Sequence, residues 1–306
     1  MKPRKIQSAS KSVPTIEGAG VRLKRAFGFR ENPKLDPFLL LDDFHSKDPK
    51  DYSAGFPWHP HRGIETITYM LHGEIKHGDS MGNEGIITPG DVQWMTAGSG
   101  IIHQEMPASR EKDRHMWGFQ LWANLPHSHK MRDPRYRGVE KKDIPEVTLD
   151  NGIKVKIICG IINGVKGPIQ DIITDPEYLD ITMLPKTSFT HEVHPDHTVC
   201  VYTIDGKAYF DGVRDPFGYE MQGAGWWTTE RDCQLGKETL IIYGEGDHVK
   251  ITTDKDPTRF LFLSGKPIKE NVAWYGPIVM NTQEELRVAF EEYQNGTFIK
   301  KPGKGH

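Results

Sequence analysis

The chain has 306 residues, of which 36% are hydrophobic and 26% charged, and its formal net charge is −3 at pH 7. This composition supports a buried core and the length allows about two domains, while the small charge gives no electrostatic basis for direct binding of nucleic acid. Apolar runs stay shorter than about 18 residues and the N-terminus MKPRKIQSASKS has no apolar signal core. We therefore expect a cytoplasmic protein that does not associate with membranes.

Short β-rich runs bounded by turn residues fill most of the chain and predict an all-β fold. They are ETITYML (65–71), KVKIICGII (154–162), YLDITML (178–184), TVCVYTI (198–204), ETLIIY (238–243) and RFLFLSG (259–265). A charged, proline-bearing stretch, DPRYRGVEKKDIP (133–145), interrupts them. We place a first barrel at residues 1–133, a second at 145–265, and a C-terminal segment at 266–306.

Residues 282–295 have a helical pattern instead. Thr282 and Glu285 form a capping box, and Gly296 follows as a stop signal. Between them runs an apolar stripe formed by Leu286, Ala289, Phe290 and Tyr293. We predict one short C-terminal helix.

Two histidine-bearing segments carry the strongest functional signal, HPHRGIETITYMLHGE (59–74) and GIIHQEM (100–106). His59 and His61 are two residues apart, as are His103 and Glu105, so each pair projects to one face of an extended strand. Two such strands side by side would bring three imidazoles and one carboxylate together. That donor set suits divalent iron, nickel, copper, zinc or manganese, and the carboxylate favours iron-type chemistry.

Other acidic and histidine residues near these segments must also be considered as metal ligands. Glu65 lies four residues after His61, which gives it the same face parity and makes it an alternative carboxylate ligand. His72 and His77 each stand beside a glycine, which predicts exposed or turn-stabilising histidines. Loop positions predict solvent exposure for His115, His127 and His129.

The second half of the chain repeats the first without its metal motif. HPDHTVCVYTIDG (194–206) matches HPHRGIETITYMLHG (59–73) in its polar entry, β-rich run and glycine turn. GAGWWTT (223–229) contains no His-x-Glu, and His191, His194 and His197 are spaced by three rather than two. We predict a duplicated barrel whose second copy binds no metal. The widely spaced Cys159, Cys200 and Cys233 indicate buried thiols rather than disulfides.

Aromatic and basic residues near the motifs suggest a pocket and its surroundings. Phe56, Trp58 and Met106 flank the ligands and would wall a pocket for a planar aromatic ligand, whereas Trp94 and Met95 fit ordinary barrel core equally well. Two basic clusters are interpreted as solvated faces, with partner docking as the alternative. They are Arg22, Lys24 and Arg25, and Lys130, Arg132, Arg135 and Arg137.

Long motifs spread along the chain resemble the pirins, a family of bicupin proteins. They include EGAGVRLKRAFG (17–28), DPFLLLDDF (36–44), GFPWHPHRGIETITYMLHGEIKHGDSMG (55–82), GDVQWMTAGSGIIHQEMP (90–107) and YGPIVMNTQEEL (275–286). The resemblance implies two cupin barrels and a C-terminal segment that folds back against the body. It also implies one iron bound by His59, His61, His103 and Glu105, with Glu65 as an outer hydrogen-bond partner.

The resemblance further implies a quercetin 2,3-dioxygenase-like enzyme that needs Fe(II). A flavonol would chelate the metal, lose a proton to Glu105 and react with dioxygen, with ring opening and release of carbon monoxide. Another enediol or catechol-like substrate is a variant of this hypothesis. The alternative is a non-enzymatic, iron-dependent redox sensor that docks on a transcription factor or metabolic enzyme. A monomer is expected in either case.

Overall fold

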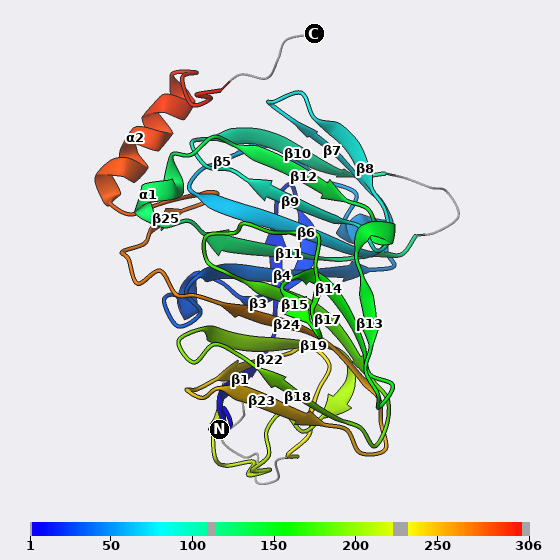
Figure 1. Cartoon of the computed structure of the whole chain (residues 1–306). Coiled ribbons are helices and arrows are strands. Elements are labelled where there is room, and N and C mark those ends of the chain that lie inside the picture. Colours follow the sequence, from blue (N-terminus) through cyan, green and yellow to red (C-terminus); the bar gives the residue numbers. More distant parts are fainter. Residues whose placement is uncertain (1, 109–113, 223–231, 302–306) are drawn as a thin grey trace. The chain divides into compact units, whose positions relative to one another are not determined.

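The computed structural model describes residues 2–108, 114–222 and 232–301 (Figure 1). It divides into two compact units. Unit 1 comprises Met1–Val13, Lys34–Asp36 and Lys142–Pro267, and unit 2 comprises Pro14–Pro33, Pro37–Lys141 and Ile268–His306. The N-terminal strand therefore belongs with the second half of the chain, and the C-terminal segment belongs with the first half.

Unit 2 contains two sheets. The larger has the strand order β12-β9-β6-β11-β4-β3-β2 and the smaller the order β5-β10-β7-β8; they form two layers in Figure 1. The larger sheet consists of β2 (Val13–Glu17), β3 (Val21–Phe27), β4 (Phe38–Ser46), β6 (Ile64–His72), β9 (Val92–Thr96), β11 (Met116–Asn124) and β12 (Arg135–Val139). The smaller consists of β5 (Phe56–His61), β7 (Ile75–Asp79), β8 (Glu84–Ile87) and β10 (Ile101–Pro107).

Apolar side chains of both sheets pack together in unit 2. One cluster contains Phe44 and Met70 of the larger sheet with Ile75 and Ile87 of the smaller sheet. Burial of such residues provides the main free energy that holds the sheets face to face. Polar residues on the facing strands are thereby enclosed as well, and these form the candidate site.

The C-terminal segment packs back on unit 2, as the resemblance to the pirins implies. It contains β25 (Ala273–Tyr275), β26 (Ile278–Met280) and α2 (Gln283–Gln294), and the predicted capping box at the start of the helix is present. Leu286 and Ala289 are buried with β26, whereas Tyr293 is 40% exposed. The buried stripe of the helix is therefore narrower than predicted. The other helical elements of unit 2 are α1 (His127–Lys130), η1 (Phe29–Glu31) and η2 (Pro49–Asp51), and the sequence boundary between the units falls within η3 (Lys141–Asp143).

Unit 1 is built around a nine-stranded sheet of order β13-β14-β17-β24-β19-β22-β1-β20, with β21 on β19. Its strands are β1 (Ile6–Lys11), β13 (Glu146–Thr148), β14 (Lys154–Cys159), β17 (Glu177–Met183), β19 (Thr198–Ala208), β20 (Glu220–Gln222), β21 (Leu235–Gly236), β22 (Thr239–Tyr243) and β24 (Thr258–Gly265). Two smaller sheets pair β15 (Ile161–Ile162) with β16 (Val165–Lys166), and β18 (Ser188–Glu192) with β23 (His248–Thr252).

The all-β prediction is confirmed, although the described strands lie in separate sheets rather than in one closed barrel per unit. Cys159, Cys200 and Cys233 are free thiols, the first two buried. The segment GAGWWTT (223–229) lies outside the described residues. Within the part of the chain that is described, no helix is both long and apolar enough to cross a membrane.

Candidate metal centre

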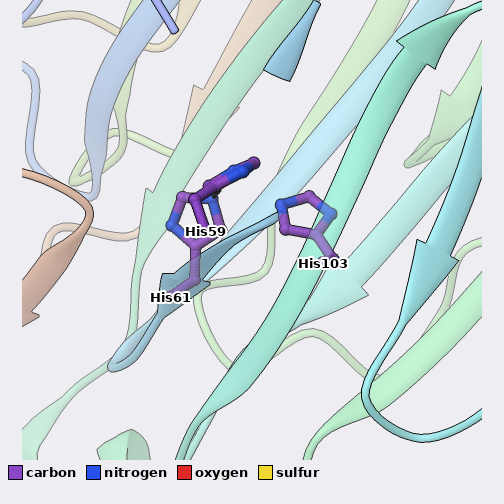
Figure 2. A group of neighbouring side chains, drawn as sticks. All are labelled: His59, His61 and His103. Carbon is purple, nitrogen blue, oxygen red and sulfur yellow. Dashed lines mark hydrogen bonds between the residues drawn. The ribbon is translucent and has the colours of Figure 1, made fainter. Parts of the chain in front are cut away.

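Neighbouring strands β5 and β10 bring the predicted histidines together. They are antiparallel, with His103 opposite His59 and Ile101 opposite His61, which confirms that the two motifs lie side by side. One ring nitrogen from each of His59, His61 and His103 lies within 4.8 Å of the others, and the three imidazoles gather in one place in Figure 2. Side chains two residues apart on β5 therefore point to the same face of the sheet, as predicted.

Backbone carbonyl groups orient two of the rings. His59 Nδ1 lies 2.8 Å from the Pro57 oxygen, and His61 Nδ1 lies 3.0 Å from the Pro277 oxygen. Because a carbonyl oxygen only accepts, each Nδ1 carries the hydrogen and each Nε2 keeps its lone pair. These two Nε2 atoms are 3.1 Å apart. The Nε2 lone pairs of His59 and His61 are thus both available to bind one metal ion.

Burial keeps the imidazoles neutral, which is the form that binds metals. Burial lowers the pKa of His61 and of His103 well below the ordinary value, and neighbouring imidazoles lower both further. It lowers the pKa of His59 as well. Neither ring nitrogen of the fully buried His103 has a hydrogen-bond partner. Such an orphaned buried group needs an explanation, and a divalent transition metal fits these donors.

Glu105 stands beside the three histidines and is held from the opposite sheet. It is buried and lines the same cavity as His59 and His61. Its Oε1 accepts hydrogen bonds from Thr68 Oγ1 at 2.8 Å and from Gln93 Nε2 at 2.9 Å. Among the described residues, the group whose ligand atoms lie within 4.8 Å of one another comprises the three imidazoles and not Glu105.

The alternative carboxylate, Glu65, is buried on β6 and accepts a hydrogen bond from Thr96 at 2.7 Å. His61 ends β5 and Glu65 belongs to β6, so they lie in different sheets, with Gly63 at φ +78° between them. Face parity does not pass through such a turn. The argument that a spacing of four places Glu65 on the face of His61 therefore fails.

The prediction for His77 is wrong, because this residue is fully buried beside the site. On β7, His77 lies opposite Glu105 and Asp79 lies opposite His103. His77 Nε2 is 3.1 Å from Asp79 Oδ2, and its ring stacks on Tyr136 with centroids 4.8 Å apart. The adjacent glycine lies within the strand rather than in a turn. A signal was available, since His-x-Asp has the same period of two as the ligand pairs.

The remaining histidine predictions have mixed outcomes. His127 is exposed as predicted, but His115 is half-buried and stacks on His72 with ring centroids 4.3 Å apart. In unit 1, His191 Nε2 lies 2.9 Å from Glu177. Among the described residues, the group able to hold a metal is the one in unit 2.

A cavity of about 760 Å³ opens beside the histidines. Its walls include Phe56 and Trp58, as predicted, but Met106 is not among the lining residues, and Trp94 and Met95 are core residues. Further apolar lining comes from Leu23, Leu40, Phe44, Trp122 and Trp274. Ligand pockets in proteins span about 300–1,000 Å³ and combine such walls with a few polar groups.

Two residues expected on solvated basic faces, Arg25 and Lys130, do not lie on such faces. Arg25 lines the cavity and donates two hydrogen bonds to Asp42. Lys130 is buried, and its Nζ donates to the backbone oxygens of Gly63 and Val279 and to Asn124. Burial lowers the pKa of Lys130 to about 7. Charge clusters in sequence do not reveal which members find acceptors in distant segments.

Two compact β-sheet units, with a histidine cluster in the unit formed mainly by the first half of the chain, have the organisation of a bicupin with a single candidate metal centre among the described residues. The family model Pirin matches residues 20–123, and Pirin C-terminal cupin domain matches residues 178–299. The chain belongs to the pirin family.

Relatives match almost end to end. A pirin-like protein of Caulobacter vibrioides is 41% identical over 300 residues, which cover 97% of this chain and all of the relative. Human pirin is 36% identical over 295 residues, covering 95% of this chain and 93% of its own length. The crystal structure of quercetin 2,3-dioxygenase from Acinetobacter baumannii aligns with a TM-score of 0.84 at 30% identity, over 97% of this chain and 98% of that one.

Proposed function

We propose that this protein is a metal-dependent, quercetin 2,3-dioxygenase-like enzyme that cleaves the heterocyclic ring of flavonol-type substrates. The observation that carries the proposal is the convergence of three neutral imidazoles, two of which, His59 and His61, line a cavity sized for a multi-ring aromatic molecule. The similarity to the Acinetobacter baumannii quercetin 2,3-dioxygenase supports it. We assign Fe(II) to His59, His61, His103 and Glu105; nickel, copper, zinc or manganese suit the same donors.

The residues of the chain have separate tasks in this reaction. The apolar walls bind the planar rings and exclude water from them, because aromatic surface prefers an apolar environment. Glu105 takes the proton of the chelating hydroxyl; since both of its hydrogen bonds described above use Oε1, we assign the proton to Oε2. When bound, the metal supplies Lewis acidity and redox chemistry with dioxygen. Dioxygen is consumed, the ring opens and carbon monoxide leaves.

The test is anaerobic reconstitution with ferrous iron, followed by oxygen-uptake and flavonol-absorbance assays. We expect iron-dependent turnover in the wild type and its loss in His103→Ala and Glu105→Gln. His127→Ala removes an exposed histidine of the same unit and should leave turnover unchanged. Tight iron binding without oxygen uptake would overturn the enzymatic proposal and favour an iron-dependent redox sensor that binds another protein.

A further inference from the structure

A row of polar side chains crosses one face of the larger sheet of unit 2. Arg25 lies opposite Asp42, Asp42 opposite Gln120, Gln120 opposite Thr68, and Thr68 opposite Gln93. Directly paired residues of neighbouring strands share a face of the sheet. The row therefore extends over five adjacent strands, β3, β4, β11, β6 and β9.

One end of the row is connected to the metal centre. Thr68 and Gln93 donate to Glu105, and Thr68 Oγ1 is also 2.8 Å from Gln120 Oε1. One hydroxyl hydrogen serves one acceptor, so the amide of Gln120 is assigned with its nitrogen toward Thr68. A chain of donors then runs from Gln120 through Thr68 to Glu105. The carbonyl oxygen of Gln120 is left to accept a hydrogen bond from a ligand.

The other end of the row is an ion pair on the cavity wall. Arg25 Nε and Nη2 donate to the two oxygens of Asp42 at 2.8 and 2.7 Å, and Arg25 Nη1 is 2.9 Å from Glu17. All three charged residues line the cavity, and Asp42 is only 5% exposed. Each oxygen of Asp42 accepts one of these bonds and so retains a lone pair.

Apolar residues border the polar row. Leu40 and Phe44 lie two residues before and after Asp42 on the same face of β4, and Trp122 has the same relation to Gln120 on β11. Asp42 and Thr68 are two strand spacings apart, which is roughly 10 Å. A planar molecule could thus contact apolar side chains with its faces while its edge spans from Glu105 to Asp42.

We propose that Arg25, Asp42 and Gln120 form a subsite that recognises a phenolic hydroxyl at the end of the substrate far from the metal centre. The hydroxyl donates to Asp42, and its oxygen accepts from Arg25. The subsite selects polyhydroxylated flavonols over flavonols that carry only the chelating pair. This inference rests on the proposed function in one respect only, the binding of the chelating end of the substrate at the metal centre.

The experiment measures equilibrium binding without oxygen, so that it does not depend on turnover. Iron-loaded protein is titrated with 3-hydroxyflavone, which has only the chelating pair, with galangin, which adds two hydroxyls on the fused ring, and with quercetin, which adds two more on the pendant ring. A hydrogen bond to a charged group predicts that quercetin or galangin binds at least ~10-fold tighter than 3-hydroxyflavone.

Two variants and one control test the assignment to Asp42. Asp42→Asn should reduce the preference to less than about threefold, with little change for 3-hydroxyflavone. The double variant Arg25→Gln/Asp42→Asn removes both charges, so neither is left buried and unpaired. It should show the same loss of preference, and it replaces the single variant in the test if that variant does not fold. Asp43→Asn alters the next carboxylate, which accepts from Trp117 Nε1 and does not line the cavity, and should keep the preference.

Each result has one meaning for the inference. Equal binding of all three flavonols by the wild type, or a preference that survives in both variants, would overturn it. Loss of preference in the variants without any turnover by the wild type would retain the subsite and reject the dioxygenase. Turnover of all three flavonols with equal affinity would retain the dioxygenase and reject the subsite.

Discussion

Arg62 is the clearest point at which a single change should release the C-terminal segment. It directly follows the candidate ligand His61 and is 2% exposed. Its Nη1 lies 2.8 Å from Glu292, its Nη2 donates to the Phe298 oxygen at 2.9 Å, and its guanidinium lies 4.2 Å from the Phe298 ring centre. Arg62→Met would remove all three interactions while keeping an unbranched apolar stem.

The cost follows from what the substitution leaves behind. Breaking a buried ion pair costs about 3–5 kcal/mol, because the remaining charge is desolvated and unpaired. Glu292 has a side chain 24% exposed and keeps Lys300 as a partner at 2.7 Å, so its carboxylate is partly compensated. We therefore expect Arg62→Met to lower the free energy of unfolding by about 2–4 kcal/mol.

Urea unfolding, followed by fluorescence and circular dichroism, measures this loss. Arg287→Met is the matched control, since Arg287 pairs with Glu284 and Glu291 on the exposed face of α2 with its side chain 55% exposed. Exposed pairs contribute about 0–1 kcal/mol, so the control should change little. If Arg62→Met and Arg287→Met were equally stable, the reasoning from burial would be refuted.

Three further changes have definite expectations. Gly63→Ala places a Cβ 1.9 Å from the Val279 oxygen at a φ of +78°, so urea unfolding should show a loss above about 2 kcal/mol, and wild-type stability would contradict this. Loss of a hydrogen-bond partner of a metal ligand typically lowers metal affinity ~10–100-fold, and loss of a ligand itself should cost more. The metal affinity of His103→Gln should therefore fall by more than about 100-fold in a chelator-competition titration, and a smaller fall would show that His103 is not a ligand. Burial raises the pKa of Asp42 to about 6 from 3.8. The folded state then binds more protons between pH 4 and 6, so stability falls by up to ~3 kcal/mol as pH rises through this window, and unfolding curves of Asp42→Asn should lack that component.

Local periodicity explains what could be predicted from the sequence. His59 and His61 share a face because they lie on one strand, and β10 lies beside β5 as expected. The capping box of α2 is equally local and was found at the expected residues. Each of these features depends on residues within a few positions of one another, where alternation or helical spacing decides the outcome.

The remaining parts of the site depend on strand register, which periodicity does not determine. Thr68 and Gln93 reach Glu105 because two sheets face each other, and no spacing in the sequence relates these residues. The glycine next to His77 predicts a turn, although His77 lies on a strand opposite Glu105. Glu65 has the face parity of His61 in the sequence, but a glycine turn separates the two residues and places them in different sheets.

The tautomer of a candidate ligand is set by the opposite end of the chain. His61 donates from Nδ1 to Pro277, which is 216 residues away, while Lys130 binds the oxygens of both Gly63 and Val279. Because Nε2 of His61 is directed to the metal position only when Nδ1 is occupied, the C-terminal segment contributes to the donor set without supplying a ligand. The affinity for the metal and the packing of the C-terminal segment on unit 2 are therefore linked. Metal binding should stabilise the packed segment, and a packed segment should raise the metal affinity.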